Sequence, residues 1–124
     1  MPERFNREAL SLLRDASEVH IETSIDGTKM HSTAIWVVVD DAGRALIRSY
    51  RGPSARWYRE ALANSKVTID VDGQKIPATV VVATDEDRIG SASTELRAKY
   101  PDDPATPRMV SDAVLSTTLE LVPR

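Results

Sequence analysis

An alternation of polar and apolar residues with a period of two runs through much of the chain and constrains its fold more than any other feature. Residues 19–25 alternate in this way, and residues 66–71 do so again. Such alternation is typical of strands that bury one face. Asp72-Gly73 then joins residues 66–71 to the apolar run 76–83, and this dipeptide favours a tight hairpin. The chain is therefore expected to be built around an antiparallel sheet.

Six segments fit strands and three fit helices. The strands are predicted at residues 19–25, 30–39, 44–50, 66–71, 76–83 and 115–122. Apolar residues at helical spacing predict helices at residues 6–16, 54–64 and 85–100, with Asn6, Ser54 and Asp85 as N-caps. A proline-rich loop at residues 101–107 and a short turn at 108–113 precede the last strand. Because helices do not follow every strand, we expect an antiparallel barrel or a strongly curled sheet rather than a doubly wound parallel sheet.

The length and residue types exclude several classes of protein. A chain of 124 residues is the length of one domain, so residues 1–124 are predicted to form a single domain. The absence of cysteine excludes disulfides, Cys-ligated metals and thiol nucleophiles. The longest apolar run, residues 34–39, is far shorter than the roughly 18 residues of a membrane helix, and residues 1–8 lack the apolar segment of a secretion signal. A cytoplasmic protein without a membrane partner is expected.

Positive charge is concentrated in one segment of a chain whose net charge is −3. Residues 42–59 contain no acidic residue and five arginines, which are Arg44, Arg48, Arg51, Arg56 and Arg59. Nucleic-acid binding favours a broad positive surface, which this chain lacks, so no nucleic-acid partner is expected. A small anionic ligand held at one place fits the pattern better. The alternative, which stays open, is that these arginines are simply solvated.

The side chains of common hydrolytic and metal-dependent sites are missing. His20 and His31 are the only histidines and their spacing fits no metal motif, so no metal site is predicted. The sequence has no nucleophile elbow around a serine and no phosphate-cradling glycine loop. The acidic runs at residues 40–41 and 85–87 fall at a turn and at a helix start, where they cap and solvate. The sequence therefore offers no hydrolase mechanism.

Residues 48–60 join a predicted strand to a predicted helix and carry the most distinctive group of polar side chains. Gly52 allows a sharp bend, and the first turn of the helix offers unpaired amides at the positive end of its dipole. The side-chain donors are the hydroxyls of Ser49 and Ser54 and the guanidinium groups of Arg48, Arg51 and Arg56. Trp57 and Tyr58 fit packing anchors better than ligand contacts. The segment is suited to the phosphate or carboxylate of a bound cofactor.

Three stretches make the chain similar to a known superfamily: residues 27–39, residues 48–52, and Trp57-Tyr58 with the helix that runs to Asn64. In these stretches it resembles the flavin-binding split β-barrel proteins of the pyridoxamine-phosphate-oxidase-like superfamily. Within that superfamily it is most similar to the small deazaflavin (F420)-dependent nitroreductase group and to the DUF2255 type of small barrel. The resemblance implies an α+β fold, a predominantly antiparallel six-stranded split β-barrel with three helices. It also implies a homodimer with the cofactor between the subunits.

The resemblance further implies which residues hold the cofactor. Lys29 corresponds to a basic contact to the cofactor phosphate, and Ser49 and Gly52 correspond to the phosphate-binding turn. Residues 33–36 match the strand whose backbone follows the edge of the isoalloxazine ring. The arginine-rich segment and the resemblance together give the predicted cofactor-binding residues. These are Lys29, Thr33, Ala34, Ile35, Trp36, Arg48, Ser49, Arg51, Gly52, Arg56 and Trp57.

The function implied by the resemblance is hydride transfer between F420 or FMN and a small organic acceptor of the quinone or nitro type. No catalytic residue is assigned, although Tyr50, Tyr58 and His31 are candidates to donate a proton. Tyr100 and Arg108 flank the proline-rich loop, which forms either a lid or an ordinary surface loop. Two alternatives stay open: a barrel that binds a cofactor or another anionic ligand without catalysis, and an empty barrel that acts through partner contacts.

Overall fold

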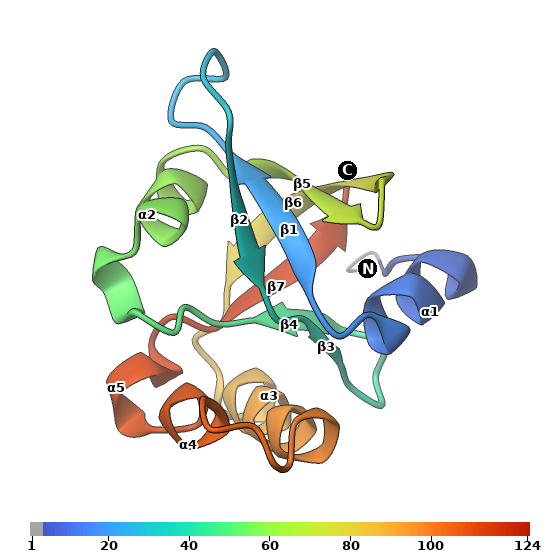
Figure 1. Ribbon diagram of the computed structural model, residues 1–124, viewed down its shortest axis with the longest axis vertical. Helices are drawn as coiled ribbons and strands as arrows, with labels where there is room; N and C mark the ends of the chain where they lie inside the picture. The colour runs from blue at the N-terminus through green and yellow to red at the C-terminus, as the bar shows by residue number, and fades with distance from the viewer. Residues whose placement is uncertain (1–3) are drawn as a thin grey trace.

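One antiparallel sheet forms the centre of the molecule (Figure 1). The computed structural model describes residues 4–124. The expectation that residues 1–8 are not a secretion signal falls partly on residues 1–3, which lie outside the described part. The strands are β1 (Val19–Thr23), β2 (His31–Ile35), β3 (Val38–Val39), β4 (Ala45–Ile47), β5 (Lys66–Val71), β6 (Gln74–Val82) and β7 (Leu119–Pro123). The helices are α1 (Arg7–Asp15), α2 (Arg56–Ala63), α3 (Glu86–Lys99), α4 (Thr106–Met109) and α5 (Asp112–Leu115), with a 3₁₀ turn at Gly52–Ser54 before α2.

The order of the strands shows that the sheet is strongly curled. The order is β2-β1-β5-β6-β7-β4-β3, and all paired strands are antiparallel. β2 and β3 therefore lie at opposite edges of the sheet, yet only Trp36 and Val37 separate them in the chain. The three backbone steps from Ile35 to Val38 span roughly 11 Å at most, so the two edges must approach one another. This curvature confirms the expected α+β, antiparallel, barrel-like fold.

The predicted number of strands, six, is wrong, because the described residues form seven. The segment 30–39 was expected to be one strand, but it breaks at Trp36 and Val37 into β2 and β3. Its apolar residues continue through the break, so the hydrophobic pattern does not mark the point where the chain changes edges. The last strand begins at Leu119 rather than at residue 115, which belongs to α5.

The predicted number of helices, three, is also wrong, since the described residues form five. α4 and α5 have four residues each, too few for a helical period to emerge from the sequence. Ser54 is not an N-cap: it ends the 3₁₀ turn, and α2 begins after Ala55, whose side chain makes no capping hydrogen bond.

The predicted strand 44–50 is shorter than expected, since β4 ends at Ile47, whereas the predicted caps of α1 and α3 and the predicted hairpin are confirmed. Asn6 accepts a hydrogen bond from the backbone of Ala9 at 2.8 Å and so caps α1. Asp85 caps α3 by accepting from the backbone of Arg88 at 2.9 Å. Asp72 and Gly73 have φ values of +50° and +90°, as a tight hairpin between β5 and β6 requires.

Two clusters of buried side chains lie on opposite sides of β3 and β4. Val39 joins the main core inside the curled sheet, whereas its neighbour Val38 packs with Leu46, Leu96 and Met109. α3 packs against β3 and β4 on this second side, where Figure 1 also shows α4 and α5. α2 packs instead against β1 and β2. The two groups of helices leave the free edge of β2 between them.

Two glycine substitutions test these backbone conformations. Gly73→Ala should lower the free energy of unfolding by about 1 kcal/mol, because Ala disfavours the positive φ of the hairpin turn. Gly90→Ala lies inside α3, where an added methyl meets no atom within 4 Å, and it should raise the free energy of unfolding by roughly 0.5–1 kcal/mol. Urea denaturation of both variants measures these changes, and a neutral Gly73→Ala would contradict the turn.

Candidate functional site

A cavity of about 290 Å³ lies along the edge of β2, between that strand, the bend after β4, the start of α2 and α4. Seven of the predicted cofactor-binding residues line it: Thr33, Ala34, Ile35, Trp36, Arg48, Arg51 and Trp57. The other lining residues are Glu18, Tyr50, Ala55, Ala105 and Met109. The fold thus gathers residues that are up to 91 positions apart, from Glu18 to Met109, around one space.

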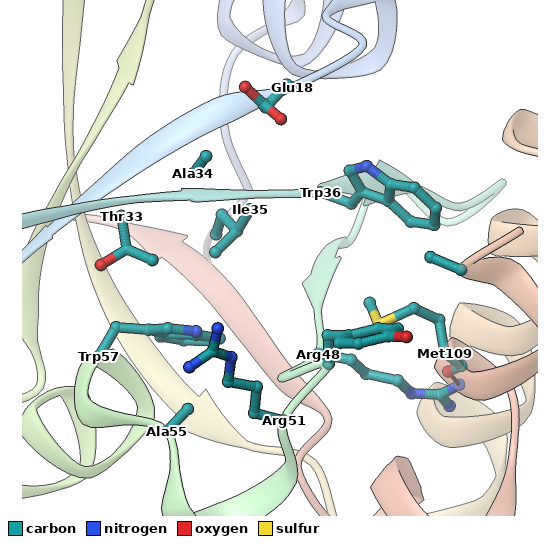
Figure 2. Close-up of a pocket in the computed structure, with 12 residues that line it drawn as sticks. Glu18, Thr33, Ala34, Ile35, Trp36, Arg48, Arg51, Ala55, Trp57 and Met109 are labelled. Carbon is teal, nitrogen blue, oxygen red and sulfur yellow. Dashed lines mark hydrogen bonds between the residues drawn. The ribbon is translucent and has the colours of Figure 1, made fainter. Parts of the chain in front are cut away.

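β2 borders the cavity with its unpaired backbone edge. It is an edge strand of the sheet, and four consecutive residues, Thr33 to Trp36, line the cavity. Figure 2 shows the side chains of Thr33 and Ile35 on the side of the strand that faces Trp57, with Ala34 on the other side. Backbone N–H and C=O groups of an edge strand point away from the sheet and can pair with the polar atoms of a ligand.

Arg51 is the cation available to a ligand. Its side chain is exposed, and Figure 2 shows its guanidinium beside the ring of Trp57, pointing into the cavity. Within residues 4–124 this guanidinium has no hydrogen bond and no ion pair. A free guanidinium with two forked pairs of donors suits a phosphate or carboxylate.

Ser49 and Gly52 build the bend that presents Arg51. Gly52 has a φ of +79°, which favours glycine, and its N–H donates to the carbonyl of Ser49 at 3.0 Å. The hydroxyl of Ser49 donates back to the carbonyl of Gly52 at 2.7 Å. Both residues are buried and neither lines the cavity. The Ser49 hydroxyl is used within the bend, and the Ser49 N–H donates to Thr117 Oγ1 at 3.0 Å, which ties the bend to the segment before β7.

Arg48 is a buried cation that the protein holds with neutral acceptors. It is only 2% exposed and is the largest fully buried side chain of the described residues. Its guanidinium donates to Thr118 Oγ1 (2.8 Å), Ser93 Oγ (2.8 Å), Met109 O (3.1 Å) and Ile89 O (2.6 Å). No carboxylate of residues 4–124 forms an ion pair with it. Burial, and to a lesser degree the charge of Arg97, lowers the pKa of Arg48 to about 10, so it remains charged at neutral pH.

The structure places Lys29 and Arg56 outside the cavity. Lys29 is exposed in the loop between β1 and β2, and Arg56 is exposed in the first turn of α2. Trp57 has two roles, because it is 6% exposed, belongs to the main core and also lines the cavity.

Of the three candidate proton donors, Tyr50 alone lines the cavity. Arg108 lies over its ring at 5.3 Å from the centroid and donates from Nε to its carbonyl at 2.6 Å. The hydroxyl of Tyr58 is directed at Ser116 O, 3.5 Å away, and burial raises the pKa of that hydroxyl. Arg108 therefore connects α4 to the bend after β4, next to the cavity.

The third candidate, His31, belongs to a buried polar cluster that the sequence analysis missed. His31 Nδ1 lies 2.9 and 3.1 Å from the carboxylate oxygens of Glu60, and the Thr23 hydroxyl donates to the same carboxylate at 2.8 Å. Burial acts to raise the pKa of Glu60, but the hydrogen bonds from Thr23 and His31 outweigh it and lower that pKa below its ordinary value of 4.5. A signal was present: Glu60 lies one helical turn after Trp57, on the buried face of α2.

A second missed group supports the cavity from outside. The rings of Trp36 and Tyr100 stack at 3.8 Å between centroids with 7° between their planes. Lys99 donates from Nζ to the carbonyls of Val37 at 2.7 Å and Leu13 at 3.1 Å. Residues 99 and 100 end α3, and sequence spacing alone does not bring them to the break between β2 and β3.

The fold has many relatives of low sequence identity. A family model described as "Uncharacterized protein conserved in bacteria (DUF2255)" matches residues 9–121. A putative pyridoxamine 5′-phosphate oxidase from Listeria innocua is 14% identical, with a TM-score of 0.67 over 94% of this chain and 91% of that one. The haem storage protein HutZ from Vibrio cholerae is 10% identical, with a TM-score of 0.69 over 98% and 91%. An F420-H2-dependent reductase, FDR-A, is 15% identical, with a TM-score of 0.61 over 85% and 93%.

At these identities the solved structures show the fold alone, which is that of pyridoxamine-phosphate-oxidase-like split barrels. No curated protein matches the chain significantly. None of the helices formed by residues 4–124 has both the length and the apolar character needed to cross a membrane.

Substituting the two cavity arginines should separate their roles. Arg48→Met leaves four acceptors without their donor and should lower the free energy of unfolding by about 2–4 kcal/mol. Arg51→Met removes no side-chain hydrogen bond or ion pair within residues 4–124 and should change the free energy of unfolding by less than about 0.5 kcal/mol. Urea denaturation measures both values, and equal losses would contradict the assignment of Arg51 as the free cation.

The Glu60 cluster predicts a pH dependence of stability. Because the pKa of Glu60 is lower in the folded than in the unfolded protein, its charged form contributes stability above pH 4.5, and this is lost as the pH falls through the folded-state pKa. The difference in unfolding free energy between wild type and Glu60→Gln should therefore shrink on acidification from about pH 7 to 3. Thr23→Val, which removes one donor, should weaken this dependence in urea titrations. A difference that stays constant with pH would refute the argument.

Proposed function

The chain belongs to the DUF2255 family, and from that premise we propose that it is an F420- or FMN-dependent oxidoreductase that transfers hydride to a small organic acceptor of the quinone or nitro type. When bound, the reduced cofactor supplies the hydride, and the protein supplies binding and orientation. The split-barrel fold supports the proposal, since one solved structure that shares it is named an F420-H2-dependent reductase.

The observation that carries the proposal is the free guanidinium of Arg51 beside the open edge of β2. An anionic tail and a flat ring with polar edge atoms are the two parts of a flavin-type cofactor. Arg51 fits the tail, and the backbone of residues 33–36 together with Trp57 fits the ring. The residues present thus suit the proposed group.

The size of the cavity indicates how much of such a cofactor it encloses. Its volume of about 290 Å³ is just below the range of roughly 300–1,000 Å³ for ligand pockets. The cavity would therefore hold the ring system, and residues 51–52 of the bend would contact the tail. Lys29 and Arg56, both exposed, are the proposed further contacts to the tail.

A homodimer is part of the proposal. Three exposed apolar side chains support it: Ile25 is 63% exposed, Met30 51% and Leu62 47%. Ile25 and Met30 lie in the loop between β1 and β2, and Leu62 lies in the last turn of α2. Exposed apolar side chains of this size are common at protein–protein interfaces.

The second candidate function is a barrel that binds the cofactor or another anionic ligand without catalysis. It is favoured by the shortage of proton donors, because Tyr50 lines the cavity while Tyr58 and His31 do not. One solved structure with the same fold is named a haem storage protein, which supports a binding role for such barrels.

Titration of the purified protein with FMN and with F420 tests the proposal. We expect one of them to bind, and at about a hundred times its dissociation constant to raise the free energy of unfolding by roughly 2.7 kcal/mol. Arg51→Gln should weaken binding about tenfold or more, since it removes a charge-assisted contact. Arg59→Gln is the matched control, because it removes an exposed arginine of α2 that does not line the cavity.

Turnover then separates the two candidate functions. Oxidation of the bound reduced cofactor by a quinone or nitroaromatic compound, followed by absorbance, supports the oxidoreductase. Binding without turnover supports the non-catalytic barrel. If neither cofactor binds, or if Arg51→Gln and Arg59→Gln behave alike, the proposal fails.

A further inference from the structure

Trp36 lies at the point where the chain leaves the sheet. It falls between β2 and β3, so no strand partner fixes its backbone. Its side chain is half-buried and lines the cavity. Figure 2 places its indole at the end of the cavity opposite Trp57. The position of this end wall therefore depends on contacts that Trp36 makes outside the sheet.

Tyr100 supplies the first of these contacts. Its ring lies nearly parallel to the indole of Trp36, 3.8 Å away between centroids, but Tyr100 does not line the cavity. The hydroxyl of Tyr100 donates to Ser17 O at 2.8 Å, and burial raises the pKa of this hydroxyl to about 12, so it keeps its proton. Tyr100 is thus anchored at its hydroxyl end and supports Trp36 with its ring.

Lys99 supplies the second contact. Its ammonium group donates to the carbonyl of Val37, the residue after Trp36, and to the carbonyl of Leu13. The same group lies 5.5 Å from the centre of the Tyr100 ring. The end of α3 therefore holds both the backbone next to Trp36 and the ring on which its indole rests.

We propose that Lys99 and Tyr100 are positioning residues that fix Trp36 as the end wall of the cavity, and that this wall limits the length of the flat ring system the cavity accepts. The inference concerns the cavity of the proposed function, and rests on that function only for the identity of the natural ligand. Without the stack, the indole turns about its side-chain bonds and the cavity lengthens towards α3. The ligand class selected by the wild-type protein is a flat aromatic anion with no more than three linearly fused rings.

Binding of aromatic sulfonates of increasing length tests the inference. Anthracene-2-sulfonate and tetracene-2-sulfonate carry the same anionic group for Arg51 and have three and four linearly fused rings, the shorter matching the three-ring system of a flavin-type cofactor. The wild type should prefer the shorter probe, and Tyr100→Leu should shift the ratio of the two dissociation constants towards tetracene-2-sulfonate about tenfold. Tyr100→Phe keeps the ring and loses only the hydrogen bond to Ser17, so it should shift the ratio much less than Tyr100→Leu does. Val67→Ala, a core change in β5 remote from Trp36, controls for lost stability.

The fluorescence of Trp36 gives a readout that needs no ligand. The chain has two tryptophans, so Trp57→Phe leaves Trp36 as the sole reporter. In that background Tyr100→Leu should lower the fluorescence anisotropy of Trp36, and Tyr100→Phe should lower it much less. If Tyr100→Leu does not fold, Lys99→Met is used in its place. This variant removes the hydrogen bonds from Lys99 to Val37 and Leu13 but keeps the stack of Trp36 on Tyr100. Its ratio of dissociation constants and its anisotropy should therefore change in the same direction, but less.

The inference is overturned if the wild type does not prefer the shorter probe, if Tyr100→Leu leaves the ratio and the anisotropy unchanged, or if Val67→Ala shifts them equally. These results are independent of the cofactor titration. A protein that binds neither FMN nor F420 but shows the sulfonate selectivity would refute the proposed function and support the end wall. A protein that binds one of these cofactors but shows no sulfonate selectivity would support the proposed function and refute the end wall.

Discussion

The two-residue link between β2 and β3 is the constraint on which the cavity depends. Trp36 and Val37 join strands at opposite edges of one sheet, which is possible only because the sheet curls. The link leaves β2 with a free edge and places Trp36 beside that edge. Lys99 then pairs with the carbonyl of Val37, which has no strand partner, and so ties the end of α3 to the link. The curvature of the sheet, the free edge of β2 and the position of Trp36 as the end wall therefore all depend on this two-residue link.

Two arginines three residues apart have opposite roles around this cavity. Arg48 is enclosed by acceptors from α3, α4 and the segment before β7, and it ties these elements to the end of β4. A cation buried without a carboxylate is costly, and the four hydrogen bonds offset that cost. Arg51 lies past the end of the strand, where the chain bends at Gly52, and its guanidinium stays free. Arg48 thus forms part of the cavity wall, and Arg51 is the proposed contact to an anionic ligand.

The chemistry of the cavity favours binding and orientation over proton transfer. Its lining is aromatic and aliphatic, with cations at the bend and the carboxylate of Glu18 as its acidic group. The hydrogen-bonded polar cluster formed by His31, Glu60 and Thr23 ties β1 and β2 to α2 and does not line the cavity. A site of this kind suits a ligand that brings its own reactivity, which is consistent with the proposed role of a redox cofactor.

The sequence by itself determined the local features, since each depends on neighbouring residues. These are the caps at Asn6 and Asp85, the hairpin at Asp72-Gly73, the antiparallel strands and the arginine-rich bend after β4, which the family resemblance associates with β2. It did not reveal the break at Trp36, because the apolar pattern runs through it, nor α4 and α5, which are too short to show a period. Which of Arg48 and Arg51 would be buried was also undetermined, as both carry the same side chain. Only the tertiary structure decided that Arg48 is the buried arginine. It also decided the contacts of Tyr100 and Lys99 with residues 36–37, and both outcomes depend on how α3 packs across the curled sheet.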